Sequence, residues 1–241
     1  MTKTFSPDEI RKLNDEFGGK SPRDLLKWAV DTFGNKVGLA NSFGIEDMIL
    51  TDMLAKVDQE HKSVIFSLDT GRLHDETYDT AERTIKKYGV QIKTYFPKFN
   101  KVEELVREKG FYSFRQSVEN RKECCGIRKI EPLTRALGEL DAWICGLRKE
   151  QSPTRADIAP IEIDRAHNNM IKINPIATWI EKEVWDYARK HDVPYNVLHD
   201  KNFPSIGCAP CTRAIQPGED VRAGRWWWES PETKECGLHS K

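Results

Sequence analysis

The cysteines of this chain fall into two groups that suggest different chemistry. Cys124-Cys125 and Cys208-x-x-Cys211 supply four thiols, a set that can hold a metal centre, whereas Cys236 stands alone near the end of a polar segment. An unpaired cysteine beside Gly237, on a flexible stretch of chain, is suited to act as a nucleophile. Such a thiol can move into a cleft and back out, so we expect it to meet two partners in turn.

The spacing of the four thiols bears on the kind of centre they could form. Cys208-x-x-Cys211 is compact, which suits two thiolates that face one ion or cluster. Neighbouring side chains on a helix point about 100° apart, so a single tetrahedral ion does not easily take both Cys124 and Cys125. A four-iron cluster accepts ligands from a wider arc and is favoured, while zinc stays open. Cys145 lies in an apolar run and is interpreted as a core residue.

Polar and charged side chains gather in three other short segments. In Ser42-Phe43-Gly44-Ile45-Glu46-Asp47, free backbone amides at a helix start would favour a phosphate or sulfate oxygen, and an ordinary capped helix start is the alternative. Asp69-Thr70-Gly71-Arg72 combines a carboxylate, a hydroxyl and a guanidinium. The third segment holds Arg148, Lys149 and Arg155, which an anionic ligand would gather, although a solvated basic loop is the plainer explanation.

The elements predicted around these segments place them at one edge of a sheet. Short apolar runs predict buried strands at 37–43, 63–68, 90–96 and 141–147. Amphipathic stretches predict helices at 46–56, 75–88, 102–109 and 117–137, and Ser6-Pro7 and Ser21-Pro22 each begin an earlier helix. Strand then helix, repeated, predicts an α/β fold with a mostly parallel sheet and helices on both faces. Ligands in such folds bind beyond the carboxyl ends of the strands.

Composition sets the class of protein. The 241 residues are 38% hydrophobic and 32% charged, as in a soluble globular protein with one full core. Because 38 basic and 38 acidic side chains cancel, neither a nucleic-acid partner nor a membrane surface is expected. The sequence shows no signal core and no apolar run long enough to span a bilayer. We therefore expect a cytoplasmic protein, in which thiols stay reduced.

With these pieces together, the chain resembles the assimilatory adenylyl-sulfate reductases, of the wider phosphoadenylyl-sulfate reductase family. The resemblance covers nearly the whole length and rests on motifs that occur in order. These are Ser42 to Asp47, Leu68 to Leu73, Cys124 to Lys129, Gly146 to Ser152, Cys208 to Thr212, Arg222 to Trp227 and Glu235 to His239. Each motif alone is weak evidence, but the ordered set is specific.

The resemblance implies an adenine nucleotide alpha-hydrolase-like fold, related to the ATP-pyrophosphatases. A single domain would cover residues 1–225, and a flexible C-terminal tail would follow at 226–241. One departure from the ATP-pyrophosphatases matters, because their loop reads Ser-Gly-Gly-x-Asp-Ser. Here Phe43 replaces the first Gly and Met48 follows Asp47. Cleavage of ATP is therefore not expected.

The resemblance also implies roles for individual residues. Cys236 would be the catalytic nucleophile, and a [4Fe-4S] cluster would be ligated by Cys124, Cys125, Cys208 and Cys211. Lys129 would lie close to both the cluster and the substrate sulfate, which Arg222 and Arg225 would hold. The other candidate substrate-binding residues are Ser42, Phe43, Gly44, Asp69, Thr70, Gly71, Arg72, Arg148, Arg155 and His239.

The implied reaction reduces adenylyl sulfate to sulfite and AMP through an S-sulfocysteine on Cys236, within sulfate assimilation and cysteine biosynthesis. Free thioredoxin or glutaredoxin is the implied reductant, and a homo-oligomer is compatible with this interpretation. The 3′-phosphorylated nucleotide, or both nucleotides, is the alternative substrate. An iron–sulfur enzyme that transfers sulfur to RNA and a non-catalytic zinc-binding interaction module are the alternative kinds of protein.

Overall fold

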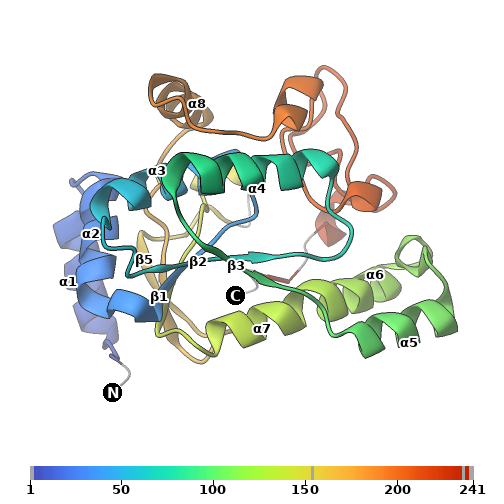
Figure 1. Ribbon diagram of the computed structural model, residues 1–241, viewed down its shortest axis with the longest axis horizontal. Helices are drawn as coiled ribbons and strands as arrows, with labels where there is room; N and C mark the ends of the chain where they lie inside the picture. Colours follow the sequence, from blue (N-terminus) through green and yellow to red (C-terminus); the bar gives the residue numbers. More distant parts are fainter. Residues whose placement is uncertain (1–2, 153–154, 235–236, 239–241) are drawn as a thin grey trace.

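The computed structural model of the protein describes residues 3–152, 155–234 and 237–238. Its centre is a six-stranded sheet with the strand order β3-β2-β1-β4-β6-β5 (Figure 1). The strands are β1 Val37–Ala40, β2 Val64–Leu68, β3 Ile92–Tyr95, β4 Ala142–Ile144, β5 Ile161–Asp164 and β6 Met170–Ile173. All neighbouring pairs are parallel except β5 and β6, which run antiparallel at one edge. The predicted mostly parallel sheet is confirmed.

The strand order creates one natural opening for a ligand. β1 lies between β2 and β4, so that Leu39 pairs with both Ile65 and Ile144. The chain continues from β1 towards β2 and β3, whereas β6 and β5 extend the sheet beyond β4. Loops that leave β1 and β4 at their carboxyl ends therefore diverge, and a crevice forms where the strand order reverses.

One face of the sheet is covered by four helices, of which the first precedes and the second follows β1. They are α2 Pro22–Phe33, α3 Ile45–Val57, α4 Asp75–Tyr88 and α8 Glu181–Lys190, while α1 Pro7–Phe17 packs against β5 at the edge (Figure 1). Ser6 and Ser21 cap α1 and α2 with complete capping boxes, as their Ser-Pro sequences predicted. Each box satisfies amides that the first helical turn leaves unpaired.

The opposite face carries α5 Phe99–Lys109, α6 Val118–Cys125 and α7 Glu131–Leu137 (Figure 1). The sequence predicted one helix over 117–137, and the structure divides this span by a π-helical turn at Gly126–Ile130. Such turns contain an extra residue and occur frequently at functional sites. The turn begins directly after the tandem cysteines, at the end of α6.

Apolar side chains fill both faces of the sheet, because successive residues of a strand point to opposite sides. On β4, Ala142 and Ile144 belong to the cluster beneath α2 and α3, whereas Trp143 and Cys145, which lies just beyond the strand, join the cluster beneath α7. Cys145 is 2% exposed, which confirms its interpretation as a core residue. Burial raises the pKa of its thiol, so it stays protonated and unreactive.

The predicted boundary between residues 225 and 226 falls within packed structure. Trp226 is only 1% exposed, and its amide donates to the carbonyl oxygen of Cys211 at 3.0 Å. Leu238, beyond the two residues that the structure does not describe, packs against the apolar cluster beneath α7. Within the described ranges, no helix combines the length and apolar character needed to cross a membrane.

Candidate active site

A cleft of about 1130 Å³ opens at the carboxyl ends of β1, β2 and β4, where the strand order predicts a crevice. The predicted substrate-binding residues that line it are Ser42, Gly44, Thr70, Lys129, Arg148, Arg155, Arg222 and Arg225. Phe43, Asp69, Gly71 and Arg72 are not among its lining residues. Cys236 and His239 lie outside the described residues, but Leu238 reaches the cleft.

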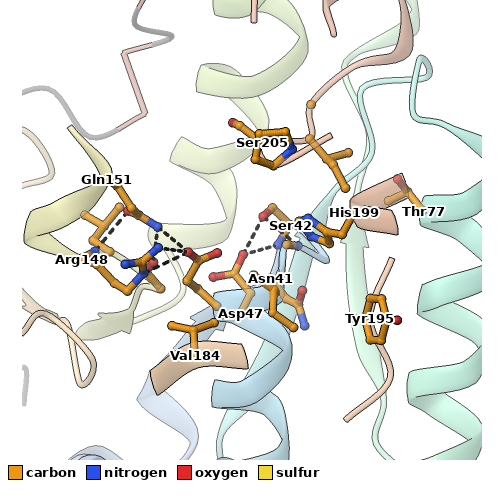
Figure 2. Close-up of a pocket in the computed structure, with 18 of the residues that line it drawn as sticks. Asn41, Ser42, Asp47, Thr77, Arg148, Gln151, Val184, Tyr195, His199 and Ser205 are labelled. Atoms are coloured by element: carbon orange, nitrogen blue, oxygen red, sulfur yellow. Dashed lines mark hydrogen bonds and ion pairs between the residues drawn. The ribbon is translucent and has the colours of Figure 1, made fainter. Parts of the chain in front are cut away.

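The loop after β1 differs from the expectation that its backbone amides are open to a ligand. The amide of Ser42 donates to Asp47 Oδ2 at 2.8 Å, and the Ser42 hydroxyl donates to the same oxygen at 2.6 Å (Figure 2). The amide of Phe43 donates to Asn41 Oδ1 at 2.7 Å, and that of Gly44 is 3.4 Å from Ser42 Oγ. Local side chains thus satisfy the donors that an oxyanion would otherwise take.

Asp47 adds an acidic group to this end of the cleft. Burial raises the pKa of its carboxyl to about 6, against the opposing effect of its hydrogen bonds with Ser42. Phe43 turns away from the cleft, with a positive φ of 61° that lets its ring enter the core. The sequence did not predict either arrangement, because both depend on how the side chains of one loop bond to each other.

The loop after β2 contacts the turn at residues 208–211, which carries two of the cysteines. Asp69 accepts from the Gly71 amide at 2.7 Å and from the Tyr78 hydroxyl, where burial and Asp69 raise the pKa of Tyr78 to about 12. Thr70 Oγ1 lies 3.2 Å from Cys208 Sγ. Arg72 stacks over Phe114, and its carbonyl oxygen accepts from the Ala209 amide at 2.8 Å. This loop therefore fixes the 208–211 turn.

Arg148 is held by carboxylates rather than left to a ligand. Its Nε and Nη2 atoms donate to Glu46 Oε1 at 3.0 and 2.9 Å, and its Nη1 donates to Glu150 at 2.9 Å (Figure 2). Arg155 donates to Gln151, whose amide nitrogen also reaches Glu46 at 3.0 Å. Because the carboxylates of Glu46 and Glu150 already pair with Arg148, this side chain stabilises the wall of the cleft.

Gly146 is where the loop after β4 meets the start of α3. A methyl group added there would lie 2.4 Å from Asp47 Oδ1 and 3.1 Å from the Asp47 amide nitrogen. We expect Gly146→Ala to lower the free energy of unfolding by about 1–3 kcal/mol, because the loop must shift to admit the methyl group. Urea unfolding measures this loss. Gly19→Ala is the matched control, since an added methyl there meets nothing within 4 Å and stability should stay unchanged.

Three cations line the cleft on the side of the C-terminal segment. Arg225 is 8% exposed, donates to Ser205 Oγ at 3.1 Å and lies against the backbone of Gly207. Arg222 donates to the carbonyl oxygen of Lys234 at 2.9 Å. Lys129, from the π-helical turn, lines both this cleft and the cavity formed by the cysteines. These three positive charges give this side of the cleft a basic character that is compatible with an anionic group.

The four predicted ligand cysteines line one small cavity, next to the cleft. The other residues around it are Arg72, Phe114, Arg121, Arg128, Lys129 and Trp226. Among the described residues, no three His, Cys, Asp or Glu side chains are grouped tightly enough for one metal ion. Ligand sulfurs about 2.3 Å from a single zinc lie within about 4 Å of each other. The four thiols therefore line one cavity, without three of them being grouped for a single ion among the described residues.

Charge around the cavity acts unequally on the thiols. Burial raises the pKa of Cys124, and burial followed by the neighbouring Cys208 raises that of Cys211 to about 12. Burial also disfavours the Cys208 thiolate, but Lys129, the Thr70 hydroxyl, Arg225 and Arg128 outweigh it and lower the pKa of Cys208. A surrounding of cations is suited to a ligand set that is anionic when it binds metal.

Two residues at or near the site, His199 in the cleft and Arg128 at the cysteine cavity, were missed by sequence reasoning. His199 lies near Ser42 in the cleft, with its Nε2 buried and without a hydrogen-bond partner in the structure (Figure 2). Burial lowers the pKa of His199, so the ring is neutral near pH 7. Arg128 donates to the carbonyl oxygen of Thr70 at 2.6 Å and joins the loop after β2 to the π-helical turn. His199 belongs to none of the motifs, whereas Arg128 lies within the Cys124 to Lys129 motif, which gave no signal for its contact with Thr70.

Comparisons with known proteins agree with this architecture. Residues 36–214 match the family model described as the phosphoadenosine phosphosulfate reductase domain. The chain is 49% identical over 231 residues to an adenosine 5′-phosphosulfate reductase of Burkholderia cepacia, covering 94% of this chain and 90% of that protein.

Solved structures extend the comparison to the fold. The crystal structure of phosphoadenylyl-sulfate (PAPS) reductase from Candida auris, in a phosphate complex, matches with a TM-score of 0.76 and 28% identity, over 89% of this chain and 100% of that one. An FMN adenylyltransferase from Candida glabrata matches with a TM-score of 0.54 and 12% identity, over 97% and 81% of the two chains, and so shares the fold alone. The chain belongs to the phosphoadenosine phosphosulfate reductase family.

Proposed function

We propose that the protein reduces adenylyl sulfate to sulfite and AMP, with Cys236 as nucleophile and a reduced dithiol protein as the source of electrons. The observation that carries this proposal is that Lys129, Arg222 and Arg225 line one cleft with Leu238, two residues beyond Cys236. A sulfonucleotide presents a sulfate group that suits three cations. The relative from Burkholderia cepacia is named for this substrate.

The chemistry needs cations because the sulfate repels an attacking thiolate. Arg222, Arg225 and Lys129 would neutralise its oxygens and orient the sulfur. The Cys236 thiolate then attacks the sulfur, a sulfur–sulfur bond forms, and the bond from sulfur to the AMP oxygen breaks. AMP leaves with that electron pair, and an S-sulfocysteine is left on the enzyme.

The second half of the reaction requires an external dithiol. A thiolate of reduced thioredoxin or glutaredoxin attacks the Cys236 sulfur and expels sulfite, and a mixed disulfide forms. The second thiol of the partner resolves it, so Cys236 returns as a thiol and the partner leaves as a disulfide. Two electrons pass from the dithiol to the sulfate sulfur. We place this cycle in the cytoplasm, where dithiol proteins are kept reduced.

A [4Fe-4S] cluster would be held by Cys124, Cys125, Cys208 and Cys211. The support is their shared cavity and the ring of cations around it. A bound cluster would supply an anionic centre that joins α6 to the 208–211 turn and keeps Lys129 oriented towards the cleft. No electron from the cluster is needed, because the dithiol supplies both.

Adenylyl sulfate is favoured over its 3′-phosphorylated form by the charge of the loop after β1. Glu46 and Asp47 line the cleft there, and the amides of Ser42, Phe43 and Gly44 already have acceptors. If the 3′-phosphate lay against this loop, it would meet the Asp47 carboxyl and amides that already have acceptors. Because these amides already have acceptors, the loop is also poorly suited to bind a pyrophosphate group. This disfavours the alternative of an enzyme that uses ATP to transfer sulfur to RNA. Sulfite release from each nucleotide with thioredoxin present tests the choice.

Arg225 offers a direct test of the sulfate site. We expect Arg225→Ala to weaken binding of adenylyl sulfate by about 10-fold to 100-fold, which is the usual loss for a hydrogen bond to a charged group. The reason is that, of the two nucleotides, only adenylyl sulfate carries the sulfate that the guanidinium would bind. Binding of AMP should change by about 2-fold or less. Isothermal calorimetry on the C236S protein measures both without turnover. Arg213→Ala is the matched control, since Arg213 pairs with Glu219 outside the cleft. Equal losses for AMP and adenylyl sulfate would argue against a sulfate contact.

A further inference from the structure

Arg121, on α6, ties the C-terminal segment to the body of the protein. Its side chain is fully buried, and its Nε and Nη2 atoms donate to the two carboxylate oxygens of Glu229, both at 2.9 Å. The Nη2 atom also donates to the carbonyl oxygen of Thr233 at 2.6 Å. Glu229 is itself 3% exposed and accepts from the Thr233 hydroxyl at 3.1 Å. One guanidinium therefore fixes both ends of residues 229–233.

A second arginine holds the next carbonyl group along the chain. Arg222 donates to the carbonyl oxygen of Lys234 at 2.9 Å, and Lys234 Nζ donates back to the carbonyl oxygen of Ala223 at 3.3 Å. The carbonyls of Thr233 and Lys234 are consecutive, and Cys236 follows two positions after Lys234. The start of the segment that carries the thiol is thus anchored on two sides.

Trp226 connects this anchor to the sulfate-facing cations. The guanidinium carbons of Arg121 and Arg225 each lie 4.7 Å from the centroid of its ring. Trp226 has a φ of 39°, a conformation that costs energy for a bulky side chain and persists only where the surroundings enforce it. Arg121 and Arg225 thereby share one buried ring, and a shift of either changes the surroundings of the other.

The same guanidinium reaches the cysteine cavity. Arg121 lines that cavity together with Cys125. One side chain thus borders the cavity of the predicted cluster ligands, the ring beside Arg225 and the base of the tail. Stability alone does not account for a buried ion pair here, because replacing such a pair by apolar residues of similar volume is often neutral or stabilising. The planar guanidinium of Arg121 instead holds Glu229 and the carbonyl group of Thr233 in one fixed orientation.

We propose that Arg121 is a positioning residue, which sets the base of the tail so that the Cys236 thiol meets the sulfate held by Arg222 and Arg225. The inference rests on the proposed function, since it takes Cys236 as the nucleophile. Arg121 touches neither the substrate nor the reacting atoms. It acts through Glu229 and the carbonyl of Thr233, and its loss should slow the attack on sulfur rather than weaken nucleotide binding.

The test replaces the ion pair by an apolar pair, in the double variant R121M/E229M, so that no charge stays buried alone. We expect sulfonation of Cys236, followed by mass spectrometry in a single turnover without reductant, to slow by about 10-fold to 100-fold. The Kd for AMP and the iron content should match the wild type. Alkylation of Cys236 by iodoacetamide, in the absence of nucleotide, should become faster because the base of the tail is no longer held.

Two further variants sharpen the comparison. Arg121→Lys keeps the charge but offers no fork, and we expect an intermediate rate of sulfonation. The control K109Q/E123Q also removes an ion pair made by α6, here a surface pair with the end of α5, and should sulfonate at the wild-type rate. Unchanged sulfonation and alkylation rates in R121M/E229M would overturn the positioning role. A wild-type protein that never gains a sulfonate would instead overturn the proposed function, and the alkylation rates would still report whether Arg121 holds the tail.

Discussion

Replacing Cys236 with serine is expected to abolish sulfite release, even with an excess of reduced thioredoxin. A serine hydroxyl is a far weaker nucleophile than a thiolate, and loss of a nucleophile costs about 10⁴-fold or more in turnover. AMP binding and iron content should be retained, because the cleft cations and the four clustered cysteines lie outside residues 235–236. A sulfite assay, calorimetry with AMP and an iron assay measure the three quantities.

The wild-type protein should show the covalent adduct that the serine variant cannot form. Mixed with adenylyl sulfate but no reductant, it should gain the mass of one SO₃ group on the peptide that contains Cys236, and thioredoxin should remove it. Cys145→Ala is the matched cysteine variant, since Cys145 is a core thiol whose pKa burial raises, and it should still form the adduct. Turnover by the serine variant, or an adduct on Cys145, would contradict the mechanism.

Replacing Cys208 with serine should prevent binding of the proposed iron–sulfur cluster and remove at least about 99% of the activity, because even the loss of residues that support metal ligands costs up to about 100-fold. Cys208 is 8% exposed, its pKa is lowered by the cations around it, and its sulfur lies 3.2 Å from the Thr70 hydroxyl. A serine oxygen is a poor ligand for iron, so one corner of the cluster would open to water and oxidation. Iron and sulfide content, together with visible absorption, measure the loss.

The paired variant for this test changes the hydroxyl beside the thiol. Thr70→Val removes the hydrogen bond to Cys208 while it keeps all four thiols, and we expect iron content near that of the wild type. If Cys208→Ser also kept its full iron content, the ligand assignment would be wrong. A wild-type protein that contained zinc and no iron would support the alternative of a zinc site.

Much of the scaffold could be predicted because its signals are local. Apolar runs of the right length located β1 to β4, and Ser6-Pro7 and Ser21-Pro22 marked helix starts that form complete capping boxes. The β5–β6 hairpin and α8 were missed. Each of those strands has four residues, and Glu162 and Lys172 interrupt their apolar pattern, so neither reads as a buried strand.

The sequence predicted which residues belong to the candidate site, but not which hydrogen bonds and ion pairs they form. Motif order brought Lys129, Arg222 and Arg225 into one group, and the structure brings them to one cleft. The hydrogen bond from the Ser42 amide to Asp47 depends on the rotamer of one side chain in the first turn of α3, which no periodicity encodes. Arg121 and Glu229 are separated by 108 positions, so only the folded chain reveals their pairing.

The π-helical turn at Gly126–Ile130 restricts how the length of this region can change in evolution or engineering. An α-helix rotates about 100° with every residue. Deleting one position between Cys125 and Leu133 would therefore rotate α6 relative to α7 about their common axis. Either the tandem cysteines would leave their cavity, or Leu133 and Leu137 would leave the apolar cluster beneath the sheet. Insertions and deletions of one residue in this turn should therefore be excluded from functional variants.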